Sequence, residues 1–158
     1  EFAAVNRVIL QSEAWAIHSP WLRDRPGDYG QLARRRLMAG AFFGAGDYVQ
    51  AQRRRLEMIA AVEEALRDVD VLLCASSMDP ACRIDIPADI ERTYPRQART
   101  PFNVTGHPAL AMMAGVSTAG LPLSVQFVGR NFDEATLFQV ARGWERAAGT
   151  DKKHPAIV

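Results

Sequence analysis

The 158-residue sequence has few cysteines, no long apolar run and no excess of charge of one sign. Its two cysteines, Cys74 and Cys82, are too few for the disulfide framework of a secreted chain, so we expect reduced thiols in a cytoplasmic protein. No apolar run approaches the length of a transmembrane helix, and no membrane association is expected. Nineteen basic residues nearly balance eighteen acidic ones. The chain therefore lacks the basic field that attracts nucleic acid.

The sequence also lacks the recognisable sets of catalytic residues. It contains no GxSxG elbow and no glycine-rich phosphate loop. Ser76 and Ser77 follow an expected strand, but a serine nucleophile needs a nearby base, and ordinary loop hydroxyls are the favoured interpretation. The only lysines, Lys152 and Lys153, stand near the end of the chain, where desolvation would not lower their pKa. We assign no catalytic residue to this chain.

Metal and cofactor sites are not expected either. The two cysteines are separated by seven residues and have no second pair of ligands at zinc-site spacing. The three histidines stand in unrelated contexts. The sequence therefore predicts no metal site and no cofactor.

Hydrophobic residues make up 48% of the chain, which is typical of a globular protein with a core. We expect one unit over residues 1–158, with a loose tail over 149–158, and an α/β fold. The periodic patterns predict helices over 2–19, 28–44 and 47–69, strands over 71–75, 109–116 and 123–129, and a last helix capped by Asp133. Three strands make a thin sheet, which indicates that the sheet is incomplete in this chain.

Residues 76–95 form the longest stretch without a periodic pattern. Prolines at 80, 87 and 95 interrupt it, so we expect an irregular segment. Long irregular segments in compact domains are usually functional or are supported by other parts of a larger protein.

The arginines at 34–36 step by about 100° each on a helix and cannot share one face. At least one of them is expected to point into the protein, where it needs a carboxylate or carbonyl partner. Pairing within the protein is the favoured interpretation. The alternative is that Arg36 binds the carboxylate of a substrate.

A longer pattern covers "TPFNVTGHPALAMMAGVSTAGLPLSVQFVGRNFDEATLFQVARGWERA", residues 100–147. It contains a proline-x-asparagine, a glycine with a proline-alanine pair, an apolar strand ending in glycine, a "GLP" turn, a strand with a glutamine, and an acidic-capped helix. In this order it resembles the C-terminal end of the amidase signature family. The upstream segments "RRRLMAG", "DYVQAQRRR" and "VDVLLCASS" fit more loosely, and Ala75-Ser76 replace a proline-threonine pair that is usual in the family.

The resemblance implies the C-terminal part of an α/β/α sandwich, in which helices flank a mixed sheet. The family hydrolyses carboxamide C–N bonds with a serine nucleophile, a cis-serine and a lysine, all of which lie in an N-terminal part that this sequence does not contain. The first residue, Glu1 rather than methionine, fits a piece of a longer chain. We expect a fragment that shapes the pocket for a small-molecule amide and is inactive alone.

The candidates for lining that pocket are Phe102, Asn103, His107 and Arg36. For Asn103 the favoured interpretation is that it ties loop backbone together, and for His107 that its ring bonds the backbone of a tight loop.

Two other functions remain open. One is the glutaminase subunit of a tRNA-dependent amidotransferase, in which Arg36 could bind the glutamine carboxylate. This function is disfavoured, because a glutamine pocket would need an acidic residue in the loop before Pro101, where Arg96 and Arg99 lie. The other is a free-standing, non-catalytic α/β binding module. The apolar faces of an incomplete sheet also favour self-association into a homo-oligomer.

Overall fold

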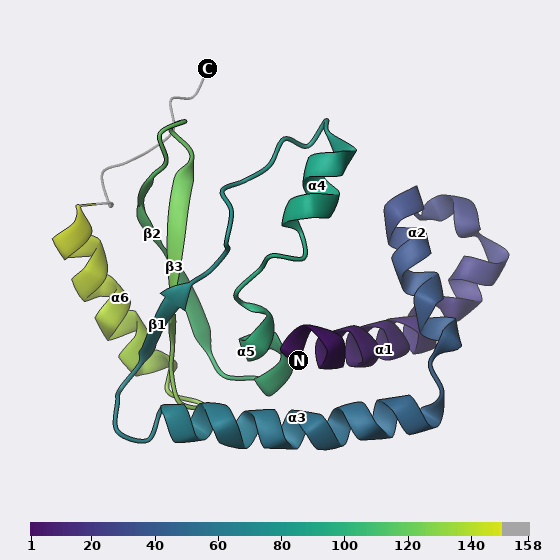
Figure 1. Cartoon of the computed structure of the whole chain (residues 1–158), viewed down its shortest axis with the longest axis horizontal. Coiled ribbons are helices and arrows are strands. Elements are labelled where there is room, and N and C mark those ends of the chain that lie inside the picture. The colour runs from purple at the N-terminus through teal and green to yellow at the C-terminus, as the bar shows by residue number, and fades with distance from the viewer. Residues whose placement is uncertain (150–158) are drawn as a thin grey trace. The chain divides into compact units, whose positions relative to one another are not determined.

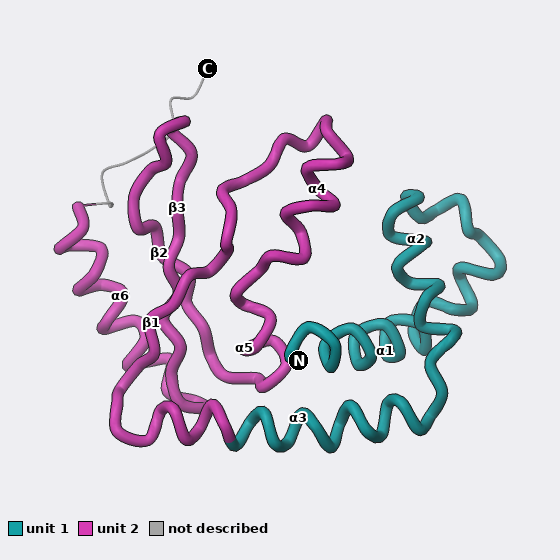
Figure 2. The backbone as a smooth tube through the Cα atoms, viewed as in Figure 1, with its two compact units in different colours: residues 1–60 teal, residues 61–158 magenta. Residues whose placement is uncertain are grey.

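The computed structural model describes residues 1–149 (Figure 1). The chain divides into two compact units, residues 1–60 and the part from Ala61 onward (Figure 2). Helix α3 (Ala45–Ala65) crosses the division. The expected loose tail lies outside the described residues except for Gly149, which ends the last helix with a φ of 61°.

The first unit is helical. Helix α1 (Phe2–Asp24) packs on helix α2 (Gln31–Met38) and on the 3-10 turn η2 (Ala39–Phe42). Gly40 is required at this contact, because a Cβ there would collide with the Gln11 carbonyl oxygen and lie 2.6 Å from Trp15 Cβ. Helix α3 begins beside α1 and runs antiparallel to it, as the Glu13–Tyr48 hydrogen bond and the Glu1–Arg54 ion pair show.

The three helices expected in the first 69 residues have other bounds in the structure; the third, expected over 47–69, is α3 and spans Ala45–Ala65. Helix α1 continues through Pro20 to Asp24, because a proline removes only one helical hydrogen bond and the last turn buries Leu22. The helix expected over 28–44 is divided into a 3-10 turn η1 (Pro26–Asp28), α2 and η2. Asp28, where that helix was expected to begin, belongs to η1.

The second unit contains a three-stranded antiparallel sheet. Strands β1 (Leu72–Ala75), β2 (Ala109–Val116) and β3 (Pro122–Val128) confirm the three expected strands and lie in the order β1-β3-β2. Helix α6 (Glu134–Ala148) covers one face (Figure 1). There the Trp144 ring packs edge-on against Phe127, and its Nε1 donates to the Met113 carbonyl at 2.9 Å. The fold class is α/β, with a small sheet.

Helix α6 begins as the sequence predicts. The Asp133 carboxylate accepts hydrogen bonds from the backbone N–H and the hydroxyl of Thr136, at 3.4 and 2.8 Å. An aspartate in this position satisfies amide groups that the first turn of a helix leaves without partners.

The other face of the sheet carries Gln126, which is 2% exposed. Its Nε2 donates to the carbonyl oxygens of Ala75 at 3.0 Å and Ala98 at 3.1 Å. Because side chains alternate along a strand, Ser124 lies on the same face as Gln126, and Phe127 on the face that α6 covers.

The segment expected to be irregular over 76–95 contains helix α4 (Pro87–Thr93), and α5 (Thr100–Thr105) follows it. Both helices have proline in the first turn, where its missing N–H costs no hydrogen bond. Gly106 ends α5 with a φ of 81°, a conformation that glycine adopts without strain. Within residues 1–149, no helix has the length and apolarity needed to span a bilayer.

Candidate functional site

A hollow of about 390 Å³ opens in the second unit, on the side of the sheet that carries Gln126. Its wall comes from the loop over 77–82, from residues of α4 and the turn after it between 90 and 99, and from 122–124 at the start of β3. Ligand pockets commonly measure about 300–1,000 Å³. The hollow is therefore large enough for a small molecule.

Backbone hydrogen bonds hold the three segments of the wall together. Ser76 N–H donates to the Ser124 carbonyl at 3.3 Å, and Met78 N–H donates to the Arg96 carbonyl at 3.0 Å. Gln126 adds its two bonds, one to the end of β1 and one to Ala98. These contacts connect segments that are far apart in the sequence.

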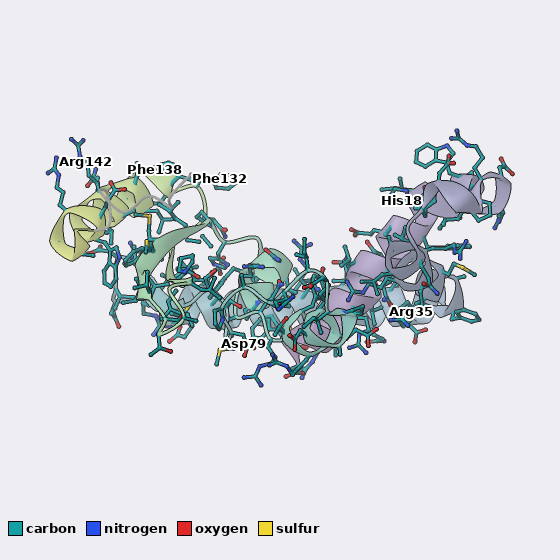
Figure 3. All side chains as sticks on the ribbon, turned by 90° about the horizontal axis from the view of Figure 1, so that it is seen from above. His18, Arg35, Asp79, Phe132, Phe138 and Arg142 are labelled. Carbon is teal, nitrogen blue, oxygen red and sulfur yellow. The ribbon has the colours of Figure 1, made fainter. Side chains whose placement is uncertain are left out.

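Asp79 is the carboxylate of the wall (labelled in Figure 3). Its side chain is 19% exposed and lies 2.7 Å from Arg96 Nε and 3.8 Å from Arg92 Nη1. Two guanidinium groups thus neutralise this carboxylate, which leaves it poorly placed to attract a further cation.

The rest of the polar wall is formed by neutral groups and one arginine. The remaining polar residues of the lining are the hydroxyl-bearing Ser77, Thr93, Tyr94 and Ser124, together with Gln97 and Arg99. Arg99 Nε donates to Gln97 Oε1 at 3.2 Å.

The wall contains no pair of nucleophile and base. None of the lining residues is a histidine or a lysine, whereas a serine nucleophile needs such a base within hydrogen-bond reach. Within residues 1–149 no group of three or more potential ligands is placed to hold a metal ion, and Cys74 and Cys82 are free thiols. The geometry offers binding groups for a polar molecule.

His107 lies in the core, not in the hollow. The residue is 5% exposed, and its Nδ1 lies 2.9 Å from the Thr105 hydroxyl. Nε2 has no hydrogen-bond partner among the described residues. Burial lowers the pKa of the ring, and the negative charge of Glu63 partly opposes the shift. The neutral form is therefore favoured.

The other three pocket candidates do not line the hollow either. Phe102 is half-buried and Asn103 is exposed on α5, whereas Arg36 is half-buried on α2 in the first unit. Phe102 and Asn103 lie on α5, and His107 follows it directly. None of the four candidates contributes to the wall of the hollow.

Sequence reasoning did not find the groups that do line it. It singled out the proline-rich segment over 76–95, which supplies much of the wall, but not Asp79 or Tyr94. Arg96 and Arg99 were considered only as evidence against a glutamine pocket. One signal in the sequence could have indicated these lining residues. Arginines and aspartates are concentrated between residues 79 and 99, in a segment without a periodic pattern.

Comparison with known proteins assigns this chain to a family. The family model described as Amidase matches residues 9–138. The chain belongs to the amidase family. This confirms the resemblance to the amidase signature family.

Two curated relatives of the chain are much longer than it is. It is 30% identical over 145 residues to "Putative amidase AmiD" of Mycobacterium tuberculosis, covering 89% of this chain and 30% of that protein. It is 38% identical over 136 residues to one component of the glutamyl-tRNA(Gln) amidotransferase of Granulibacter bethesdensis, covering 80% of this chain and 27% of that component. The chain thus spans less than a third of the length of these relatives.

Solved structures show the same fold. A crystal structure of an amidase superposes with a TM-score of 0.81 and 25% identity, over 93% of this chain and 35% of that one. A 6-aminohexanoate cyclic dimer hydrolase superposes with a TM-score of 0.78 and 20% identity, over 99% of this chain and 36% of that one. The small sheet of the amidase-family chain is therefore an incomplete part of a larger α/β fold.

Proposed function

We propose that this chain is the C-terminal part of an amidase that hydrolyses the carboxamide C–N bond of small linear amides. In this proposal the acyl group passes to a serine, ammonia or an amine leaves, and water releases the acid. The serine nucleophile, the cis-serine and the lysine base belong to the N-terminal part of the enzyme. The observation that carries the proposal is the Amidase family match over residues 9–138.

The role of this chain in the reaction is to form walls of the substrate pocket. A hollow with binding groups and no nucleophile–base pair fits this role. Walls that orient the amide and exclude water let the catalytic groups of the other part act on a fixed carbonyl. We retain Phe102, Asn103, His107 and Arg36 as candidates for contacts that form when the N-terminal part is present.

A second candidate function is that of the glutaminase subunit of a tRNA-dependent amidotransferase. The observation that favours it is the 38% identity to a glutamyl-tRNA(Gln) amidotransferase component. This function would require partner proteins, and its substrate would be glutamine.

The proposal includes three further properties. The partner is a small-molecule amide, with no nucleic acid or membrane bound by this chain. The chain associates with a second copy of itself. The enzyme works in the cytoplasm, where Cys74 and Cys82 stay reduced.

Ammonia release tests the proposal. We expect the 158-residue chain to release no ammonia from a panel of aliphatic and aromatic amides, and the polypeptide extended by its N-terminal part to release it. Turnover by the 158-residue chain alone would contradict the assignment of catalysis to the N-terminal part. An extended polypeptide that hydrolyses no amide, and releases ammonia from glutamine only with partner proteins, would favour the amidotransferase.

A further inference from the structure

We propose that the hollow over residues 77–82, 90–99 and 122–124 binds amides that carry a second, negatively charged carboxylate, and that Arg99 holds this carboxylate. The inference rests on the proposed amidase function for the amide part of the ligand. The carboxylate preference rests on the charges of the wall alone.

The acidic groups near the hollow are already paired. Asp79 is held by Arg96 and Arg92, and Arg92 Nη2 also lies 3.5 Å from Asp89. Farther along the same loop, Arg83 and Asp85 pair with each other at 2.6 Å. A cationic ligand would therefore find no free carboxylate among the lining residues.

Two charged residues line the hollow, Asp79 and Arg99. Asp79 is already paired with Arg96 and Arg92, whereas Arg99 has no ion pair among the described residues. An anionic group that enters the hollow would neutralise the charge of Arg99.

Arg99 has unused hydrogen-bonding capacity. Among the described residues its guanidinium has one acceptor, the neutral Gln97 Oε1 at 3.2 Å from Nε. Its two terminal nitrogens, Nη1 and Nη2, have no hydrogen-bond acceptor within residues 1–149. A guanidinium presents two parallel N–H groups that match the two oxygens of a carboxylate. Arg99 can therefore bind a carboxylate in a bidentate manner without breaking an existing ion pair.

The amide end of the ligand needs neutral hydrogen-bonding groups. Ser77 and Ser124, each of which carries a hydroxyl, line the same hollow as Arg99. A hydroxyl can both donate to a carbonyl oxygen and accept from an amide N–H. The wall thus provides one charged contact and separate neutral contacts, the set that a monoamide of a short dicarboxylic acid requires.

Equilibrium binding to the 158-residue chain tests the inference without any turnover. The probes are succinamate, the monoamide of a four-carbon dicarboxylic acid, and butyramide, its uncharged counterpart, titrated by NMR at low ionic strength. We expect succinamate to bind at least about tenfold more tightly, as expected for a hydrogen-bonded charge pair. Its addition should shift the backbone amide signals of 77–82, 93–99 and 122–124. Added salt should reduce the preference.

Matched variants identify the residue that binds the carboxylate. Arg99→Gln should lower the affinity for succinamate about tenfold and leave that for butyramide unchanged. Arg83→Gln removes an arginine of the same loop that does not line the hollow, and it should change neither affinity. Circular dichroism spectra identical to the wild type would show that both variants fold.

Three results would overturn the inference. These are equal affinities for the two probes, equal losses in R99Q and R83Q, and no saturable succinamate binding at concentrations on the order of tens of millimolar. An extended polypeptide that hydrolyses neutral and charged amides equally well would refute the inference and leave the amidase function standing. Succinamate binding together with an extended polypeptide that hydrolyses no amide would refute the amidase function alone.

Discussion

At the residue scale, His107 shows how burial controls the charge of a side chain. The residue is 5% exposed, its Nδ1 contacts the Thr105 hydroxyl, and burial lowers its pKa against the opposing effect of Glu63. The unfolded chain, in which the ring is hydrated, binds the proton more tightly than the folded chain. Protonation of His107 therefore favours unfolding.

We expect His107→Gln to reduce the loss of stability on acidification. The stabilisation that comes from the neutral ring is present above the ordinary histidine pKa of about 6.5 and is lost as the pH falls through and below it. The wild-type thermal midpoint should therefore fall more steeply than that of H107Q between about pH 8 and about pH 5. Thermal unfolding followed by circular dichroism measures both slopes.

His18→Gln is the matched control. His18 is half-buried, and its Nδ1 bonds the Tyr29 hydroxyl at 3.0 Å. This variant measures how much the loss of a histidine elsewhere in the chain changes the slope. The same slope in wild type and H107Q would show that His107 does not contribute to acid sensitivity.

At the scale of elements, Gln126 joins strand β3 to two other segments. Its amide reaches the last carbonyl of β1, at Ala75, and the Ala98 carbonyl before α5. A strand glutamine in this position was part of the family pattern, but the pattern did not indicate what it bonds. The structure shows that it fastens one end of the loop that lines the hollow.

We expect Gln126→Leu to lower the free energy of unfolding by about 1–3 kcal/mol, because two carbonyl oxygens lose their buried donor. Urea unfolding measures the loss. Hydrogen exchange should become faster at the amides of 76–78 and 96–99, where the loop is fastened to the sheet.

Gln139→Leu provides the control for this experiment. Gln139 is exposed on α6, so its replacement should leave both the unfolding free energy and the exchange of the loop nearly unchanged. If Q126L and Q139L were equally stable, the two hydrogen bonds of Gln126 would not hold the loop.

At the scale of the whole molecule, exposed apolar side chains lie on the outer side of α6. Phe132 and Phe138 are 96% and 64% exposed and lie in a row with Arg142 (Figure 3). Phe132 has a φ of 63°, a costly conformation for a residue with a large side chain. Glu134, Phe138 and Arg142 follow each other at four-residue steps, and neither charged group has an ion pair among the described residues. In an antiparallel pair of α6 helices, Glu134 of each copy would face Arg142 of the other.

We expect the chain to form a weak dimer through this surface. Phe138→Glu should shift it to the monomer, because it buries a charge at the centre of the helix pair. Light scattering after size-exclusion chromatography over a range of concentrations gives the mass.

Exchanging the charges tests the antiparallel arrangement. Glu134→Arg and Arg142→Glu should each weaken the dimer, since each places like charges opposite one another. The double variant should restore it. A double variant that remains monomeric at concentrations where the wild type is a dimer would contradict this arrangement.

The predicted elements agree with the structure wherever a local pattern is sufficient. Alternating side chains identified β3, continuous apolar runs identified β1 and β2, and Asp133 marked the start of α6. Helix α4 was missed because Pro87 was taken as an interruption, and α5, which contains Pro101, was not predicted either. Both prolines lie in the first turn of a helix, where proline is favourable.

The sequence by itself determined the family, the order of the strands along the chain and the cap of the last helix, because each depends on residues close together in the chain. Only the tertiary structure decided which residues form the hollow. Asp79, Arg99 and Ser124 meet because β1 pairs antiparallel with β3 and because Gln126 holds the Ala98 carbonyl. The proximity of these residues depends on strand pairing and on hydrogen bonds between distant segments, and no local pattern of side chains specifies it.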